Sequence, residues 1–85
     1  MVTIELFGVP RLRAGIARRM VEATTVGSAL MALVSEIPAL DDLLRHGEIH
    51  PAYRLSLNGE RFVTDLDTPL NDGDSLLLLS ADVGG

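Results

Sequence analysis

Alternation of apolar and polar residues at the start of the chain predicts a β-strand. In residues 2–7, VTIELF, an aliphatic side chain occupies every second position, which is the period of a half-buried strand. Gly8 and Pro10 then interrupt the pattern. Residues 16–23, IARRMVEA, are more polar and predict a second strand at the edge of a sheet, where charged side chains protect against unwanted pairing.

The middle of the chain predicts one amphipathic helix. Thr25 is a suitable N-cap, because its hydroxyl can accept a hydrogen bond from an early backbone N–H of the helix. The apolar residues that follow recur at helical spacing and form one stripe: Val26, Leu30, Leu33, Val34 and Ile37. Pro38 stops or resets this helix. Residues 39–47, ALDDLLRHG, predict a further short helical turn that ends at Gly47.

The second half of the chain predicts three more strands. Residues 53–57, YRLSL, alternate again, and Asn58-Gly59 predicts a hairpin because both residue types tolerate positive φ. Residues 60–63 form the expected return strand, and turn-forming residues follow up to position 74. Residues 75–80, SLLLLS, form an apolar run without alternation, which predicts a strand that is buried on both faces or paired in the centre of the sheet.

The order strand, strand, helix, strand, strand, strand predicts an α+β fold of the β-grasp type. In this arrangement a mixed sheet of about five strands packs on one main helix, and the last strand pairs with the first in the sheet centre. The length of 85 residues is that of one small domain with a modest core. We therefore assign residues 1–85 to a single domain and expect residues 81–85 to form a flexible C-terminal tail.

Composition narrows the functional classes. The net charge of −5 disfavours a basic surface for nucleic acid, and the absence of cysteine removes disulfides, thiolate metal sites and cysteine nucleophiles. All seven basic residues are arginine, so the chain offers no lysine for isopeptide bond formation. The first residues do not resemble a signal peptide, and the apolar run 76–79 is too short to cross a bilayer. These features predict a cytoplasmic protein without membrane contact.

Few residues form a pattern typical of catalysis or metal binding. His46 and His50 have the spacing of two helical zinc ligands, but Gly47 and Pro51 argue against a continuous helix and no third ligand is evident. We interpret both histidines as loop residues and expect no metal site. The chain contains no phosphate-binding glycine loop and no arrangement typical of a nucleophilic triad, so we expect it to bind no cofactor.

The last residues, SADVGG, carry a more specific chemical possibility. Gly84 and Gly85 lack a Cβ atom, so their backbone can enter a narrow channel close to its walls. A carboxylate presented on Gly85 can attack the α-phosphate of a nucleotide and become an acyl-adenylate, which then accepts sulfur or an amine. In such a reaction the chain supplies the reactive group and a partner supplies the catalysis.

Several of these features together resemble the MoaD/ThiS family of ubiquitin-like sulfur carriers. They are the β-grasp order, the Asn58-Gly59 turn and, above all, residues 68–85, TPLNDGDSLLLLSADVGG. This segment has the family's proline-leucine pair, Asp-Gly-Asp turn, apolar strand and diglycine end. The resemblance covers essentially the whole chain and is closest to the small subunit of molybdopterin synthase, whose first strand is similar to VTIELFG.

The resemblance implies a protein cosubstrate rather than an enzyme. A ubiquitin-activating-type enzyme would use ATP and magnesium to adenylate Gly85, and a sulfurtransferase would then supply sulfur to give a thiocarboxylate there. The carrier would deliver this sulfur to an acceptor synthase, such as the large subunit of molybdopterin synthase, with Val83 and Gly84 threaded into that partner. The family's docking surface lies on the open face of the sheet and, by position, includes Phe7, Phe62 and Leu79.

Three residues before the diglycine depart from the molybdopterin branch. Ser80 and Ala81 stand where a proline pair is common, and Asp82 stands where an apolar residue is common. Carriers for thiamine, cysteine or sulfur-containing secondary metabolites therefore stay open, although the length and the helix-rich middle favour molybdopterin. Two other classes also stay open: a ubiquitin-like modifier joined through Gly85 to lysines of other proteins, and a binding module with an incidental tail.

Overall fold

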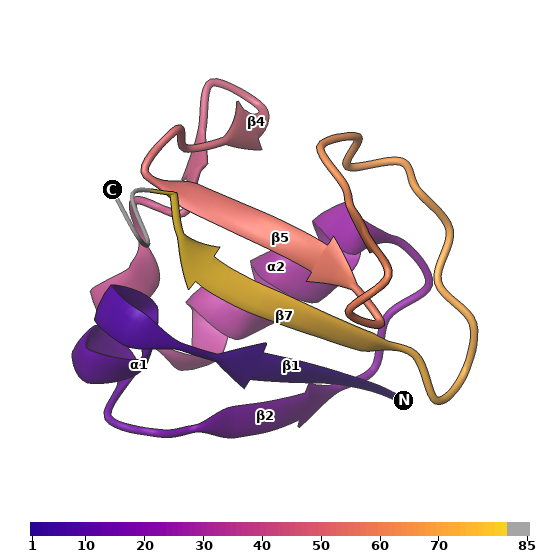
Figure 1. Cartoon of the computed structure of the whole chain (residues 1–85), viewed down its shortest axis with the longest axis horizontal. Coiled ribbons are helices and arrows are strands. Elements are labelled where there is room, and N and C mark those ends of the chain that lie inside the picture. Colours follow the sequence, from indigo (N-terminus) through magenta and orange to yellow (C-terminus); the bar gives the residue numbers. More distant parts are fainter. Residues whose placement is uncertain (82–85) are drawn as a thin grey trace.

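The computed structural model describes residues 1–81, in which a mixed sheet packs against one long helix (Figure 1). The sheet has the order β2-β1-β7-β5-β6. Its strands are β1 (Val2–Leu6), β2 (Arg18–Val21), β5 (Tyr53–Leu57), β6 (Arg61–Phe62) and β7 (Ser75–Ser80). The long helix is α2 (Val26–Glu36), and the shorter α1 (Gly8–Ala14) joins β1 to β2. This is the β-grasp arrangement that the sequence predicts.

The strand β7 lies in the centre of the sheet, as predicted. It runs parallel to β1 and antiparallel to β5. Leu76 and Leu78 are fully buried on the side of α2, whereas Leu77 and Leu79 are only partly buried on the other side. Of the two alternatives that the sequence offers for this strand, central pairing is confirmed and burial on both faces is not, because α2 covers only one side of the sheet (Figure 1).

The helix α2 begins at the predicted cap. The Thr25 hydroxyl oxygen accepts a hydrogen bond from the Ser28 backbone N–H at 3.1 Å, and the Ser28 hydroxyl oxygen accepts one from the Thr25 N–H at 3.1 Å. This reciprocal pair is a capping box that satisfies two otherwise unpaired donors. The buried side chains of the helix are Val26, Ala29, Leu30 and Leu33, and they share one core with the aliphatic residues of β1, β5 and β7.

The helix α1 differs from the sequence prediction, which places a break at Gly8 and Pro10. Pro10 is the third residue of α1, where a missing N–H costs no hydrogen bond because the first turn has no acceptors within the helix. Gly15 ends the helix with φ 74° and donates its N–H to the Arg11 carbonyl at 2.9 Å. Phe7 follows β1 in an extended conformation and occupies the N-cap of α1, so the first strand ends one residue earlier than predicted.

The connection between α2 and β5 also differs from the prediction of a helical turn over residues 39–47. A 3-10 turn, η1 (Pro38–Leu40), is followed by a small hairpin of β3 (Leu44–Arg45) and β4 (Glu48–Ile49). His46 and Gly47 form its two-residue loop with φ values of 52° and 75°. Two successive positive φ angles match the twist of a tight hairpin and are incompatible with a continuing helix.

Candidate functional site

The candidate site is the end of the sheet at which β7 finishes. The Ala81 N–H donates to the Ala52 carbonyl at 2.8 Å and so continues the β5–β7 ladder by one residue. Figure 1 shows α1 and the segment before β5 gathered at this end of the sheet. Of the predicted tail, the structure describes only Ala81. The predicted threading residues Val83 and Gly84 and the predicted thiocarboxylate site Gly85 lie outside the described residues.

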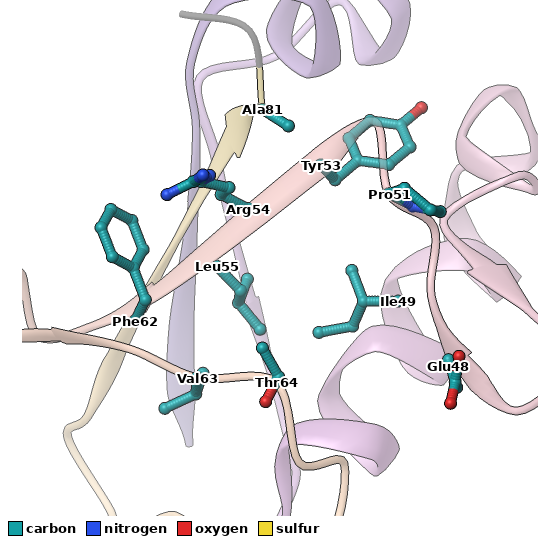
Figure 2. Close-up of a pocket in the computed structure, with 10 residues that line it drawn as sticks. All are labelled: Glu48, Ile49, Pro51, Tyr53, Arg54, Leu55, Phe62, Val63, Thr64 and Ala81. Atoms are coloured by element: carbon teal, nitrogen blue, oxygen red, sulfur yellow. The ribbon is translucent and has the colours of Figure 1, made fainter.

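Two hollows border Ala81. The larger has a volume of about 630 Å³ and extends along β5 past Arg54 to Phe62 (Figure 2). The smaller has a volume of about 440 Å³ and lies between α1 and the turn before β5. Its wall includes Arg13 and Tyr53. The first residue after the central strand therefore borders a hollow on each of two sides.

The three predicted docking residues lie on one side of the sheet, away from α2. Leu79 pairs with Arg54 across β7 and β5, and Phe62 pairs with Ser56 across β6 and β5. Because Arg54 and Ser56 are two residues apart in one strand, their partners share a face. Phe7 continues the alternation of β1 on this face and is 37% exposed, while Phe62 is 58% exposed. Their role in docking stays a prediction.

Arg54 belongs to the same face and was not singled out by the sequence. Its guanidinium carbon lies 5.3 Å from the centroid of the Phe62 ring, which is a cation–π contact. Figure 2 shows both side chains on one side of β5. The alternation of YRLSL is the signal that could have identified Arg54, since it places this residue on the other face of the strand from the buried Leu55. The contact fixes a positive charge at the rim of the larger hollow.

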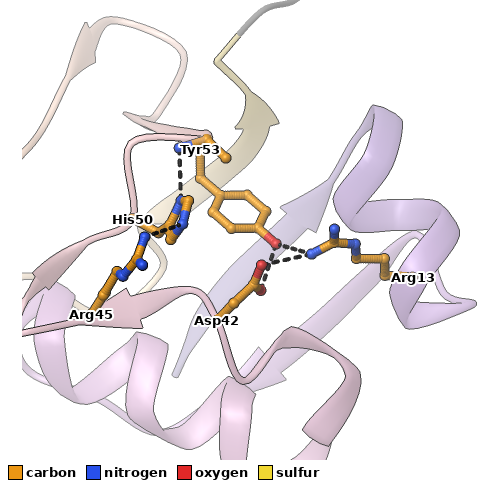
Figure 3. A network of polar contacts seen from close by, with 6 residues as sticks. Arg13, Asp42, Arg45, His50 and Tyr53 are labelled. Atoms are coloured by element: carbon orange, nitrogen blue, oxygen red, sulfur yellow. Dashed lines mark hydrogen bonds and ion pairs between the residues drawn. The ribbon is translucent and has the colours of Figure 1, made fainter.

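A polar cluster of Arg13, Asp42 and Tyr53 borders the smaller hollow (Figure 3). We call it the Arg13–Asp42–Tyr53 cluster. The Tyr53 hydroxyl donates to one Asp42 carboxylate oxygen at 2.7 Å. One Arg13 nitrogen donates to the other Asp42 oxygen at 2.8 Å and to the Tyr53 hydroxyl oxygen at 2.7 Å. The three side chains come from α1, the turn after η1 and the first residue of β5, so no local sequence pattern could have predicted them.

Each member of the cluster stabilises a defined charge state of the others. Burial, followed by the hydrogen bond to Asp42, raises the pKa of Tyr53 to about 12. The hydrogen bond from Tyr53, together with the Arg13 guanidinium, lowers the pKa of Asp42. At neutral pH the cluster therefore consists of a neutral phenol between a carboxylate and a guanidinium.

The two histidines considered as zinc ligands lie in and after the β3–β4 hairpin. His50 braces the turn before β5: its Nδ1 accepts a hydrogen bond from the Ala52 N–H at 2.9 Å, and its carbonyl accepts one from the Tyr53 N–H at 3.0 Å. Its Nε2 lies 3.0 Å from an Arg45 guanidinium nitrogen (Figure 3). Among residues 1–81, no three histidine, cysteine, aspartate or glutamate side chains come close enough together to hold a metal ion. Within the same residues, no helix has the length and apolarity needed to cross a membrane.

Solved structures of other small proteins are similar to this chain over their full length. SAMP1 from Haloferax volcanii is 32% identical, with 99% of this chain and 98% of that chain covered and a TM-score of 0.80. A chain of the complex of subunits 1 and 2 of the molybdopterin-converting factor from Helicobacter pylori is 26% identical, with 99% and 97% covered and a TM-score of 0.68. A chain of the BexX/CysO complex from Amycolatopsis orientalis is 22% identical, with 100% of both chains covered and a TM-score of 0.85, which shows a shared fold. No protein-family model and no curated protein sequence matches the chain.

Proposed function

This chain belongs to the MoaD/ThiS family of ubiquitin-like sulfur carriers, and we propose that it carries sulfur as a thiocarboxylate on Gly85. The observation that carries the proposal is the position of β7, a central strand that is hydrogen-bonded on both sides and ends at Ser80. The last described backbone bond, from Ala81 to Ala52, lies four residues before Gly85. Four residues span at most about 14 Å when extended. A rigid sheet can therefore present the Gly85 carboxylate inside a partner's active site at that distance.

The proposed cycle has two steps at the Gly85 carboxyl group, the first at one of its oxygen atoms and the second at its carbon atom. A carboxylate oxygen of Gly85 attacks the α-phosphorus of ATP, which forms an acyl-adenylate and releases pyrophosphate. Hydrosulfide supplied by a sulfurtransferase then attacks the acyl carbon, AMP leaves, and loss of the proton gives the thiocarboxylate. Both steps take place in partners, of which the adenylating enzyme supplies ATP and magnesium. We assign the cycle to the cytoplasm, where ATP is available.

We propose molybdopterin as the product of the pathway that receives the sulfur. The similarity to a chain of the complex of subunits 1 and 2 of a molybdopterin-converting factor supports this assignment. The acceptor would be the large subunit of molybdopterin synthase, which would contact the sheet face that contains Phe7, Phe62 and Leu79 and enclose the tail with Val83 and Gly84. Because this face is the side of the sheet that α2 leaves open, docking there requires no rearrangement of the core.

A second function, attachment to other proteins, is favoured by the similarity to SAMP1, a small archaeal modifier protein. In that case an amine of a target lysine, rather than a sulfur nucleophile, would attack the same acyl-adenylate. The absence of lysine from this chain means that modifier molecules could not be joined to one another through lysine side chains. Modified targets would therefore carry no lysine-linked chains of the modifier.

An intact-mass experiment tests the proposal. The purified chain is incubated with ATP, magnesium, a MoaD-type adenylating enzyme and a sulfur donor. The expected result is the exchange of one oxygen for sulfur, located on Gly85 by fragmentation. A chain that lacks Gly85 is the control, because it keeps all described residues and moves the terminal carboxylate back by one residue to Gly84.

Two other outcomes decide against sulfur transfer. Isopeptide adducts on lysines of added proteins, without a thiocarboxylate, would identify a modifier. If neither product forms, or if the chain without Gly85 is sulfurated equally well, the carrier function at Gly85 is refuted. Supplying purified molybdopterin synthase large subunit and the pterin precursor then tests the pathway, because sulfur transfer should depend on that subunit.

A further inference from the structure

We propose that the Arg13–Asp42–Tyr53 cluster positions the tail for reaction at Gly85, an inference that rests on the proposed function. In this role the three side chains touch neither ATP nor the sulfur donor. They act through the backbone at Ala52 and Ala81, and they set the direction in which the chain leaves β7. They are therefore positioning residues.

The first part of the argument is the short covalent and hydrogen-bonded path from the cluster to the tail. Tyr53 follows Ala52 directly, and the Ala52 carbonyl accepts the Ala81 N–H at 2.8 Å. Tyr53 is almost fully buried, with 6% of the residue exposed. Its hydroxyl donates one hydrogen bond, to Asp42, and accepts another, from Arg13. A shift of this ring moves the Ala52 carbonyl, and the Ala81 N–H must follow or lose its acceptor.

The second part is the position of the cluster between the two walls of the smaller hollow. One wall is α1, with Val9 and Arg13, and the other is the turn with Pro51 and Ala52. The hydrogen bond from Arg13 to Tyr53 joins α1 to the strand that follows this turn. Ser80 and Ala81 line the same hollow. The cluster therefore fixes the separation of the two elements between which the tail begins.

The third part is the directional character of the contacts. The Tyr53 oxygen donates to Asp42 and accepts from Arg13, so the phenol has one orientation that satisfies both bonds. Charge-assisted hydrogen bonds of this kind are short and roughly twice as strong as neutral ones. Apolar packing would tolerate small rotations, whereas this arrangement selects one position for the backbone of β5 at its first residue.

Three substitutions test the inference. Tyr53→Phe keeps the ring and removes the hydroxyl, Asp42→Asn keeps the shape and removes the charge, and Arg13→Gln removes the link to α1. Arg19→Gln is the matched control, because the Arg19 guanidinium also pairs with a carboxylate, that of Glu36 at 3.6 Å, and is similarly exposed, 40% against 46% for Arg13. Arg19 lies in the edge strand β2 and takes no part in the proposed site.

Two measurements are made on each variant. Amide hydrogen exchange at Ala81 should be about tenfold faster in Tyr53→Phe than in the wild type, because local opening requires less free energy. With an adenylating enzyme that turns over the wild-type chain, kcat should fall roughly tenfold at unchanged KM, since a misdirected tail reacts poorly while the docking face is intact. Arg19→Gln should match the wild type in both measurements.

Each outcome gives a decision. Unchanged exchange at Ala81 in all three cluster variants overturns the inference, and so does an equal loss of kcat in Arg19→Gln, which would indicate general destabilisation. If Tyr53→Phe does not fold, Asp42→Asn and Arg13→Gln supply the same comparison. Failure of the wild-type chain to be adenylated refutes the proposed function instead, whereas the exchange measurement needs no partner and still judges the positioning of Ala81.

Discussion

The two ends of the central strand are held in different ways. At its start, the Ser75 N–H donates to the Asn58 side-chain oxygen at 2.8 Å, and the Asn58 amide donates to Asp74 at 3.1 Å. Asp74 also accepts the Asn71 N–H at 2.8 Å, which lowers the pKa of its carboxyl. Asn58 belongs to the turn between β5 and β6, and Asn71 and Asp74 belong to the segment that leads into β7, of which Ser75 is the first residue.

At the end of β7, the Ala52 carbonyl accepts the Ala81 N–H, and the neighbouring Tyr53 is held by side chains from other segments. Arg13, Asp42 and Tyr53 belong to three separate segments, and they meet only when the sheet and α1 are in place. The Asn58 contacts at the start of the strand therefore join residues up to 17 positions apart, whereas the cluster at its end joins residues up to 40 positions apart. The comparison teaches that the end proposed for chemistry depends on side chains from three segments, whereas Asn58 and Asp74 at the start come from two turns.

The largest loss of unfolding free energy is expected for a substitution in the middle of β7, and the losses at its two ends are compared with it. Leu78→Ala should lower the free energy of unfolding by about 3 kcal/mol, because it leaves a cavity in a fully buried core. Leu79→Ala is the matched control in the same strand, on the partly exposed face. Urea denaturation should show a much smaller loss for Leu79→Ala. Equal losses would mean that the two faces do not differ in burial as described.

At the start of β7, Asn58→Ala should cost about 2 kcal/mol of unfolding free energy. The change removes the hydrogen-bond acceptor of the Ser75 N–H and places a Cβ-bearing residue without a polar side chain at φ 56°. Asn58→Gly should lose less unfolding free energy than Asn58→Ala, because glycine adopts the positive φ at this position without strain. Asn71→Ala is the control, because the hydrogen bond from Asn71 uses its backbone. A loss in Asn71→Ala as large as that in Asn58→Ala would contradict this explanation.

At the end of β7, a smaller effect should appear as a pH dependence. The pKa of Tyr53 is raised to about 12 in the folded state, from its ordinary value of 10.0, so the neutral phenol stabilises the fold. This contribution is fully present below pH 10 and should be lost as the pH rises from 10 through 12. Urea denaturation across this range should show a decline in stability that Tyr53→Phe reduces. An identical decline in both proteins would exclude Tyr53 as its cause.

Much of the scaffold follows from local patterns. The period of two in β1 identifies its buried face, Thr25 marks the start of α2, and Asn58-Gly59 marks the turn before β6. These features depend on residues close in sequence, so a pattern can identify them. The apolar run of β7 identifies a central strand but not its half-buried face, because that depends on which side of the sheet the helix covers.

The rest of the site depends on contacts that no local pattern contains. The Gly8 and Pro10 signals are those of a break, although proline in a first turn and a glycine with positive φ after the last turn are also typical of a short helix such as α1. Residues 39–47 have helical composition, but His46 and Gly47 adopt hairpin angles. Arg13 and Asp42 have no sequence feature that pairs them, since they lie 29 positions apart and the fold brings them into direct contact.

The central place of β7 has a consequence for synthesis on the ribosome. The strands β1 and β5 each hydrogen-bond to β7 and not to each other, so a nascent chain that stops before Ser75 has two separated halves of a sheet. Long-range strand pairing of this kind must wait until all partners have been made. The residues that hold Ala81 are made earlier, but their contacts with it can form only after β7 has emerged. The activating partner is therefore expected to meet a finished domain and not a growing chain.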